Sequence, residues 1–325
     1  MARAAQQADG TYDFRPLFEP VAPIVSAADV AICHMETPIA EDDQDISGYP
    51  VFSAPRRVAD GIAAAGFDGC STASNHSLDR GLPGIASTLA AFDAVGLKHA
   101  GTGRSEPEAE APAVYVADGV RIANLSYAYG SNLGPLPGAA PWSMNLIDPG
   151  RVISDARAAR RRGAAVVVAS LHWGVEYHPD ATSSQEVVAK SVMASGAVDL
   201  IVGHHAHVPQ GIRKVAGRWV VFGLGNFVSN QSPTCCAPAS QDGVMVRVDL
   251  AVSPGSPADI EGVVYTPLRV DRAGGYRVVP VGEALRDPGL AGALDPNELR
   301  SSYVRTVAVV AAAPDPLLRT SATPP

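Results

Sequence analysis

Five of the eight histidines in this 325-residue chain follow apolar runs that are typical of buried strands. His76 follows the run 67–73, His172 follows 164–171, and three more histidines follow 198–202. The carboxyl ends of strands in layered α/β proteins share one edge, where ligand sites are built. We therefore expect these side chains to converge on one cleft. The third group comprises His204, His205 and His207.

The types and spacing of these residues suit a metal site. A His-x-His pair such as His205 and His207 directs both imidazoles to one side, since side chains alternate with period two. Glu36 and Asn75 also end strand-like runs and add oxygen donors. Together with His172, this set offers nitrogen and oxygen but no sulfur, which suits Zn, Mn or Fe. One or two such ions could activate a water and neutralise a phosphoryl or carbonyl oxygen.

A lone histidine at the end of a strand is more often a hydrogen-bonded core or rim residue than a metal ligand. Histidines at the ends of three strands favour a metal site, because separate hydrogen-bonding roles would not explain why all three groups lie at strand ends. His34, His99 and His178 lack this company. We interpret them as structural, although His34 lies close to Glu36 in the sequence and could join the site.

The elements that must position these residues alternate between strand-like runs and helix-like segments from residue 29 to 224, which indicates an α/β layered fold. After residue 243 the pattern changes to alternating strands that are typical of an antiparallel sheet. One domain is therefore expected over residues 12–285. Residues 286–325 hold one helical segment and a proline-rich end that we expect to be frayed.

Composition and charge exclude several classes of protein. Hydrophobic residues make up 46% of the chain, which is enough for a core and excludes a wholly disordered chain. The net charge of −8 argues against a nucleic-acid partner, because phosphate binding needs a clustered basic surface. The chain has no apolar run of about 18 residues, as a transmembrane helix needs, and Met1–Gly10 lacks the features of a secretory signal.

The four cysteines do not form a C-x-x-C motif, so a zinc site built from thiolates is not expected. Cys33 and Cys70 lie in apolar, strand-like runs, and we interpret them as small buried hydrophobic residues. Cys235 and Cys236 are adjacent, and adjacent cysteines rarely form a disulfide with each other for geometric reasons.

Five motifs give the chain a resemblance to the bacterial CapA-type capsule-synthesis family, the poly-γ-glutamate biosynthesis relatives in the metallophosphatase-like superfamily. The resemblance covers about residues 12–230. It implies a four-layer sandwich, in which two mixed β-sheets are flanked by helices and a metal centre lies at the strand ends. The motifs are ETP at 36–38, SNHSLDRG at 74–81, LHWGVEY at 171–177, GHHAHV at 203–208 and GLGNFVS at 223–229.

The resemblance also implies roles for the metal-site residues. Glu36 matches the acidic residue that bridges two metals, and Asn75 matches a metal-binding amide. His172 and His205 look like ligands of one ion, and His207 looks like a ligand of the other. Which two of the three clustered histidines bind is open at this stage, so His204 is a further possible ligand.

The resemblance gives His76 a different role, as the imidazole that would protonate the leaving group. Asp79, Glu176 and Asn226 lie in motifs that resemble those of the family and are possible additional site residues, but the sequence assigns them no role.

The chain departs from the family in two respects. Relatives usually begin with a strand that ends in Gly-Asp, whose aspartate is a ligand of the first metal, and no such segment precedes Tyr12. The usual Asn-Leu-Glu also reads His34-Met35-Glu36. Either the start of the protein is truncated or one metal-binding position is defective because it lacks a ligand. We expect the natural protein to start upstream of Met1.

The sequence thus predicts a metal-dependent hydrolase of capsule or poly-γ-glutamate biosynthesis that cleaves a phosphoester or an amide bond. The alternative is a non-catalytic accessory protein that helps to assemble or export an anionic capsule polymer. A secreted phosphodiesterase unrelated to capsule is a weaker third hypothesis. The family further suggests a membrane capsule-synthase complex as a partner and an extracytoplasmic or membrane-associated location.

Overall fold

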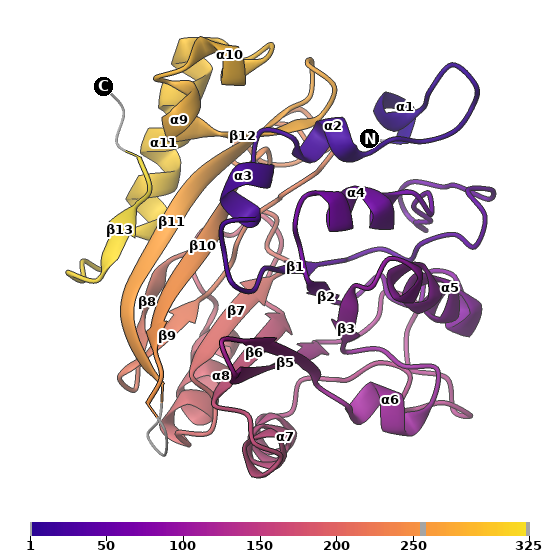
Figure 1. Ribbon diagram of the computed structural model, residues 1–325, viewed down its shortest axis with the longest axis vertical. Helices are drawn as coiled ribbons and strands as arrows, with labels where there is room; N and C mark the ends of the chain where they lie inside the picture. Colours follow the sequence, from indigo (N-terminus) through magenta and orange to yellow (C-terminus); the bar gives the residue numbers. More distant parts are fainter. Residues whose placement is uncertain (1, 254–257, 323–325) are drawn as a thin grey trace.

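The computed structural model, which describes residues 2–253 and 258–322, contains three β-sheets with helices packed around them (Figure 1). The smallest sheet is parallel and has the strand order β1–β2–β3. Its connections contain the helices α4 (Val58–Ala64) and α5 (Gly81–Ala94), because parallel strands need a crossover between them. The strands are β1 (Ile32–His34), β2 (Gly69–Ser71) and β3 (Lys98–Ala100).

The largest sheet has six strands in the order β4–β5–β6–β7–β9–β8. Its central strands are parallel, and the edge strands β4 and β8 are antiparallel to their neighbours. The helices α7 (Pro149–Arg161) and α8 (Ser183–Ala194) cover one face, and the central strands are continuous apolar runs because both of their faces are covered. The strands are β4 (Ala113–Ala117), β5 (Val120–Ala128), β6 (Val166–His172), β7 (Leu200–His204), β8 (Ile212–Val215) and β9 (Arg218–Val221).

The third sheet covers the other face of the six-stranded sheet. Trp219 and Val221 of β9 share one hydrophobic cluster with Val244 of β10 and Val263 of β11. The strands β10, β11 and β12 are antiparallel, whereas β13 runs parallel to β11. The bounds are β10 (Asp242–Ala251), β11 (Asp259–Asp271), β12 (Arg277–Pro280) and β13 (Leu318–Thr320).

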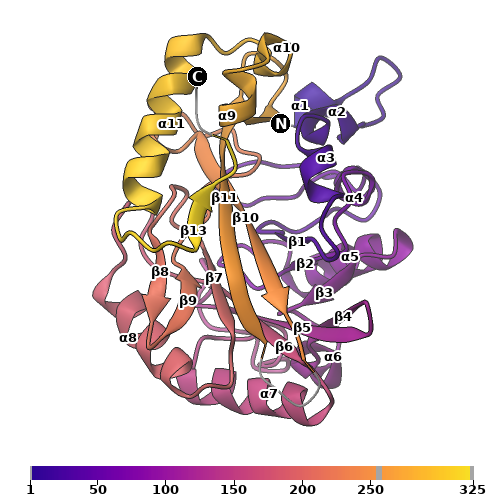
Figure 2. The ribbon, with the colours of Figure 1, turned by 60° about the vertical axis from the view of Figure 1, so that its left-hand side comes forward.

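Of the remaining helices, α9, α10 and α11 lie beside the third sheet and α1, α2 and α3 lie near the N-terminus, whereas α6 lies in the connection from β3 to β4 (Figure 1). Figure 2 shows α11 and β13 beside β11, on the side away from the N-terminal helices. None of the helices in the described part of the chain is long and apolar enough to cross a membrane. The helices are α1 (Ala2–Ala5), α2 (Arg15–Phe18), α3 (Ala22–Val25), α6 (Glu106–Glu110), α9 (Val281–Ala284), α10 (Pro288–Ala291) and α11 (Pro296–Val310).

The α/β class and the mixed sheets flanked by helices are confirmed, and β1–β3 form an additional sheet of their own. The expectation for the C-terminal segment is wrong in two respects. It contains two helices, α10 and α11, and residues 318–320 form β13 instead of a frayed tail. β13 forms because residues 263–265 of β11 offer an edge that β12 leaves open. Residues 323–325 lie outside the described residues.

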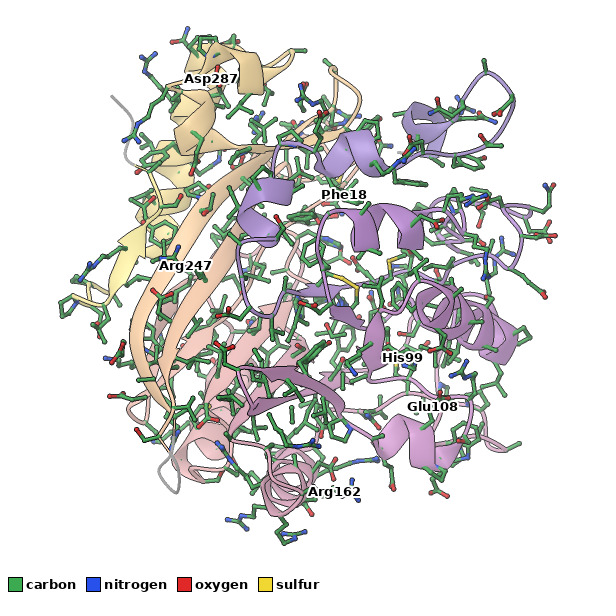
Figure 3. The ribbon with its side chains drawn as sticks, in the orientation of Figure 1. Phe18, His99, Glu108, Arg162, Arg247 and Asp287 are labelled. Carbon is green, nitrogen blue, oxygen red and sulfur yellow. A yellow bond between two sulfur atoms is a disulfide. The ribbon has the colours of Figure 1, made fainter. Side chains whose placement is uncertain are left out.

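The cysteines form two disulfides, so Cys33 and Cys70, which we interpreted as small buried hydrophobic residues, pack in a hydrophobic cluster and are also bonded to each other (Figure 3). The parallel register of β1 and β2 places these two opposite each other, with their Cα atoms 4.3 Å apart. Cys235 and Cys236 are bonded although they are adjacent, in a turn where both amides donate to the Ser232 carbonyl oxygen. No cysteine in the described residues is free, so none offers a thiolate to zinc.

A buried ion cluster joins α11 to the third sheet. Asp242, at the start of β10, is fully buried and accepts hydrogen bonds from Arg269 at 2.9 Å and from Ser302 and Arg305 of α11, both at 2.7 Å. Arg269 is itself buried and also donates to Glu298 at 3.0 Å. Each charge in this cluster is paired, whereas removal of one partner would leave the others uncompensated.

We therefore expect Asp242→Ala to lower the free energy of unfolding by about 3 kcal/mol, because it leaves the buried Arg269 and the partly exposed Arg305 without this carboxylate. Urea denaturation followed by circular dichroism measures this change. Asp249→Ala is the matched control on the same strand, since Asp249 pairs with the exposed Arg247, labelled in Figure 3. It should cost less than about 1 kcal/mol. Equal losses of unfolding free energy in both variants would show that the buried cluster stabilises the protein no more than an exposed ion pair does.

Candidate metal centre

The predicted metal ligands lie where the three-stranded and six-stranded sheets meet. Glu36 follows β1 and Asn75 follows β2, while His172 ends β6, and His205 and His207 follow β7. The β1–β2 pair and the β6–β7 pair are both parallel, so the carboxyl ends lie at one edge of each sheet. The side chains at these two edges are close enough to share one centre.

Four of these side chains present donors to one point. The Nε2 atom of His172 lies 2.8 Å from Oδ1 of Asn75 and 3.9 Å from Oε1 of Glu36. One donor atom each from Glu36, His172 and His205 lie within 4.8 Å of one another. This grouping of donor atoms could hold a divalent cation.

The protonation states of the site also suit a cation. Oε1 of Glu36 is buried and has no hydrogen-bond partner among the described residues, which is costly for a carboxylate unless a cation neutralises it. Burial lowers the pKa of His205 to about 4. Burial and the neighbouring histidines hold the pKa of His172 well below its usual value. Both rings are therefore neutral near pH 7, as metal binding requires.

His207 approaches the same carboxylate from another side, with its Nε2 atom 3.7 Å from Oε1 of Glu36. Its Nδ1 atom lies 3.0 Å from Oδ1 of Asn226, which accepts a hydrogen bond from that nitrogen and leaves Nε2 directed at Glu36. The backbone is left-handed at both His205 (φ 89°) and His207 (φ 57°), a conformation that non-glycine residues rarely adopt. The loop is thus held in a strained shape that brings both rings to the site.

His76 is separate from the donor group, and Asp79 holds it in place. The Nδ1 atom of His76 lies 2.8 Å from Oδ2 of Asp79, and the same oxygen accepts a hydrogen bond from the Phe52 amide at 2.7 Å. Burial lowers the pKa of His76, but the hydrogen bond and the charge of Asp79 outweigh it, and the pKa lies above its usual value. This arrangement suits a residue that carries a proton near neutral pH.

The four possible additional residues fall into different places. Asp79 and Asn226 each orient one histidine, as described above. The His204 ring does not join the donor group but stacks on His34, with 4.0 Å between the ring centroids. Glu176 is close enough for its charge to act on Tyr177, whose pKa burial and this carboxylate raise to about 12.

Sequence analysis did not identify Tyr129 and Asn132, which follow β5. The Tyr129 ring centroid lies 4.8 Å from that of His205, and the side chain is 50% exposed at the surface. The Asn132 side chain lies 3.3 Å from Nε2 of His76 and accepts a hydrogen bond from Asn75. Since β5 is parallel to β6, its carboxyl end lies at the same edge, and the strand-end rule applied to β5 would have found both residues.

Comparisons with known proteins show which proteins the chain resembles. Residues 1–231 match the family described as bacterial capsule synthesis protein PGA_cap. The chain is 29% identical over 259 residues to the capsule biosynthesis protein CapA of Bacillus anthracis, covering 77% of this chain and 61% of that protein. It is also 29% identical over 272 residues to the PGA biosynthesis protein CapA of Bacillus subtilis, covering 78% of this chain and 68% of that protein. The chain thus spans about two thirds of the length of these relatives.

One solved structure with a distant likeness is the calcineurin-like phosphoesterase YfkN from Bacillus subtilis. It is 14% identical, with a TM-score of 0.44, and the alignment covers 78% of this chain and 74% of that one.

We expect the unsubstituted protein to bind Zn²⁺ or Mn²⁺ and His172→Ala to weaken that binding by more than about 100-fold, because the variant removes a donor from the centre of the group. Titration calorimetry on protein first treated with a chelator measures the affinity. His99→Ala is the control, since His99 lies in β3 and pairs with Asp93, outside the donor group. Equal affinities for all three proteins would argue against this ligand set.

Proposed function

The chain belongs to the family of bacterial capsule synthesis proteins, and from this premise we propose that it is a metal-dependent hydrolase in capsule or poly-γ-glutamate biosynthesis. The observation that carries the proposal is the His76–Asp79 pair, which lies beside the donor group without being part of it. A protein that only held a metal or a polymer would have little need of a separately oriented imidazole.

Different residues of the chain would bind the ion and donate the proton during hydrolysis. Glu36, Asn75, His172 and His205 would hold the ion, and His207 contacts the same carboxylate. When bound, a divalent ion would activate a water and neutralise charge on a phosphoryl or carbonyl oxygen. The same chemistry serves a phosphoester and an amide, so the proposal includes both.

His76 would supply the proton that the leaving group needs. Its Nδ1 atom is engaged by Asp79, which leaves Nε2 as the nitrogen that can donate. In the structure, Nε2 accepts a long hydrogen bond of 3.3 Å from the Nδ2 atom of Asn132, so a protonated His76 would have to exchange this contact for a leaving-group oxygen or nitrogen to which it donates. A raised pKa keeps His76 protonated over a wider pH range, which favours its action as a general acid.

The family supports a proposal for the substrate class. The names of the relatives point to capsule and PGA biosynthesis, so we propose an anionic polymer, or a phosphoester formed during its synthesis, as the substrate. A membrane-bound capsule-synthase complex is the partner that this role would require.

We expect His76→Ala to lower kcat by about 10²–10⁴-fold and to leave the bound metal nearly unchanged, because His76 donates a proton and is not a ligand. Hydrolysis of bis(p-nitrophenyl) phosphate and of poly-γ-glutamate by metal-loaded protein gives the rate, and elemental analysis gives the metal content. Asp79→Asn should weaken the same step while keeping the ring in place. His178→Ala is the control, since this histidine is exposed and outside the site.

The outcomes separate the candidate functions. Loss of metal from His76→Ala would make His76 a ligand instead of an acid. A metal-loaded protein that hydrolyses neither substrate class but binds the polymer would support the accessory protein.

A further inference from the structure

A hydrogen-bonded chain runs from the backbone of β1 to the candidate metal ligand His172. His34, the last residue of β1, places its Nε2 atom 3.0 Å from Nδ1 of His172. Its Nδ1 atom lies 2.8 Å from Oγ of Ser71, which in turn lies 3.4 Å from the Cys33 carbonyl oxygen. His34 therefore connects a backbone group to the far side of the ring whose Nε2 atom faces Glu36.

The β-sheet register fixes the geometry of this chain. His34 and Ser71 are direct partners in the parallel pairing of β1 and β2, so the hydroxyl lies beside the ring without any adjustment of the loops. The ring plane of His34 is held by His204, which stacks on it with an interplanar angle of 9°. His34 thus has little freedom to turn away from His172.

The hydrogen bonds of this chain can run in either of two directions. In the first, the Ser71 hydroxyl donates to the Cys33 carbonyl oxygen and accepts from the Nδ1–H group of His34. The Nε2 atom of a neutral His34 then carries a lone pair and accepts from the Nδ1–H group of His172. This direction leaves the Nε2 lone pair of His172 free, on the side where Glu36 and Asn75 lie.

The opposite direction is also possible, with each proton moved along by one bond. His172 would then donate a hydrogen bond from Nε2 to Oδ1 of Asn75, and this nitrogen would have no lone pair with which to bind a metal. Only the first direction is compatible with a bound cation, because a ligating nitrogen needs its lone pair. An acceptor at the position of His34 Nε2 is what stabilises that direction.

We propose that His34 is a positioning residue that holds His172 in the tautomer protonated on Nδ1 and so prepares Nε2 for the metal. This inference deepens the proposed function and rests on its metal site. It assigns a role to a residue that the sequence analysis interpreted as structural. The chemical basis is the usual one for metal-binding histidines, whose second nitrogen donates to a partner that orients the ring.

Two variants of similar size separate the hydrogen bond from simple packing. His34→Leu fills the space but offers no acceptor, whereas the side-chain oxygen of His34→Gln can still accept from His172. We expect His34→Leu to weaken Zn²⁺ affinity about 10- to 100-fold and His34→Gln to retain most of the affinity of the unsubstituted protein. His99→Leu, in β3 of the same sheet, is the matched control and should leave the affinity unchanged.

The tautomer itself is read on the unsubstituted protein by long-range ¹H–¹⁵N NMR spectra of histidine. In the zinc-loaded protein, His172 should carry its proton on Nδ1 and His34 should carry its own on Nδ1 as well. This measurement decides the question even where His34→Leu does not fold. A proton on Nε2 of His34 would overturn the inference.

The affinity series distinguishes failure of this inference from failure of the proposed function. Zinc binding by the unsubstituted protein that His34→Leu leaves unchanged overturns the role of His34 alone. An unsubstituted protein that does not bind zinc or manganese overturns the proposed metal site and the inference together.

Discussion

The contact between His172 and Asn75 is the point where two sheets of the molecule meet, and the site depends on it. His172 ends a strand of the six-stranded sheet, and Asn75 follows a strand of the three-stranded sheet, yet their donor atoms are 2.8 Å apart. The six-stranded sheet supplies His172 and His205 to the donor group, and the three-stranded sheet supplies Glu36 and Asn75. The packing of the two sheets therefore sets the distances on which any metal chemistry would depend, and a small change in that packing would be felt at the site.

Electrostatics divides the site into two parts with opposite requirements. On the metal side, burial keeps His172 and His205 uncharged, and one oxygen of Glu36 has no hydrogen-bond partner among the described residues, which favours a cation. On the other side, Asp79 raises the pKa of His76, which favours a proton. His76 favours the protonated form because a carboxylate, that of Asp79, is its direct hydrogen-bond partner. His172 has Asn75 and His34 as its hydrogen-bond partners and favours the neutral form.

The sequence was informative wherever a rule of local pattern applied. Apolar runs followed by polar residues predicted that Glu36, Asn75, His172 and His207 would lie together, because parallel strands place their carboxyl ends at one edge. The same patterns contain no information on which strands lie opposite each other. The Cys33–Cys70 disulfide depends on the pairing of β1 with β2, and the contact of His34 with His172 depends on how the three-stranded sheet packs against the six-stranded sheet, so neither was predicted.

The hydrophobic cluster between the six-stranded sheet and the strands β10 and β11 limits where a shorter fragment of the protein can end. The family match ends at residue 231, whereas the strands that cover Trp219 and Val221 begin at residue 242. A fragment cut at the end of the match would lack β10, β11 and α11 and would expose the apolar face that they cover, a feature that promotes self-association. The segment beyond the match is thus part of the folding unit, and a soluble fragment for biochemical work has to include it.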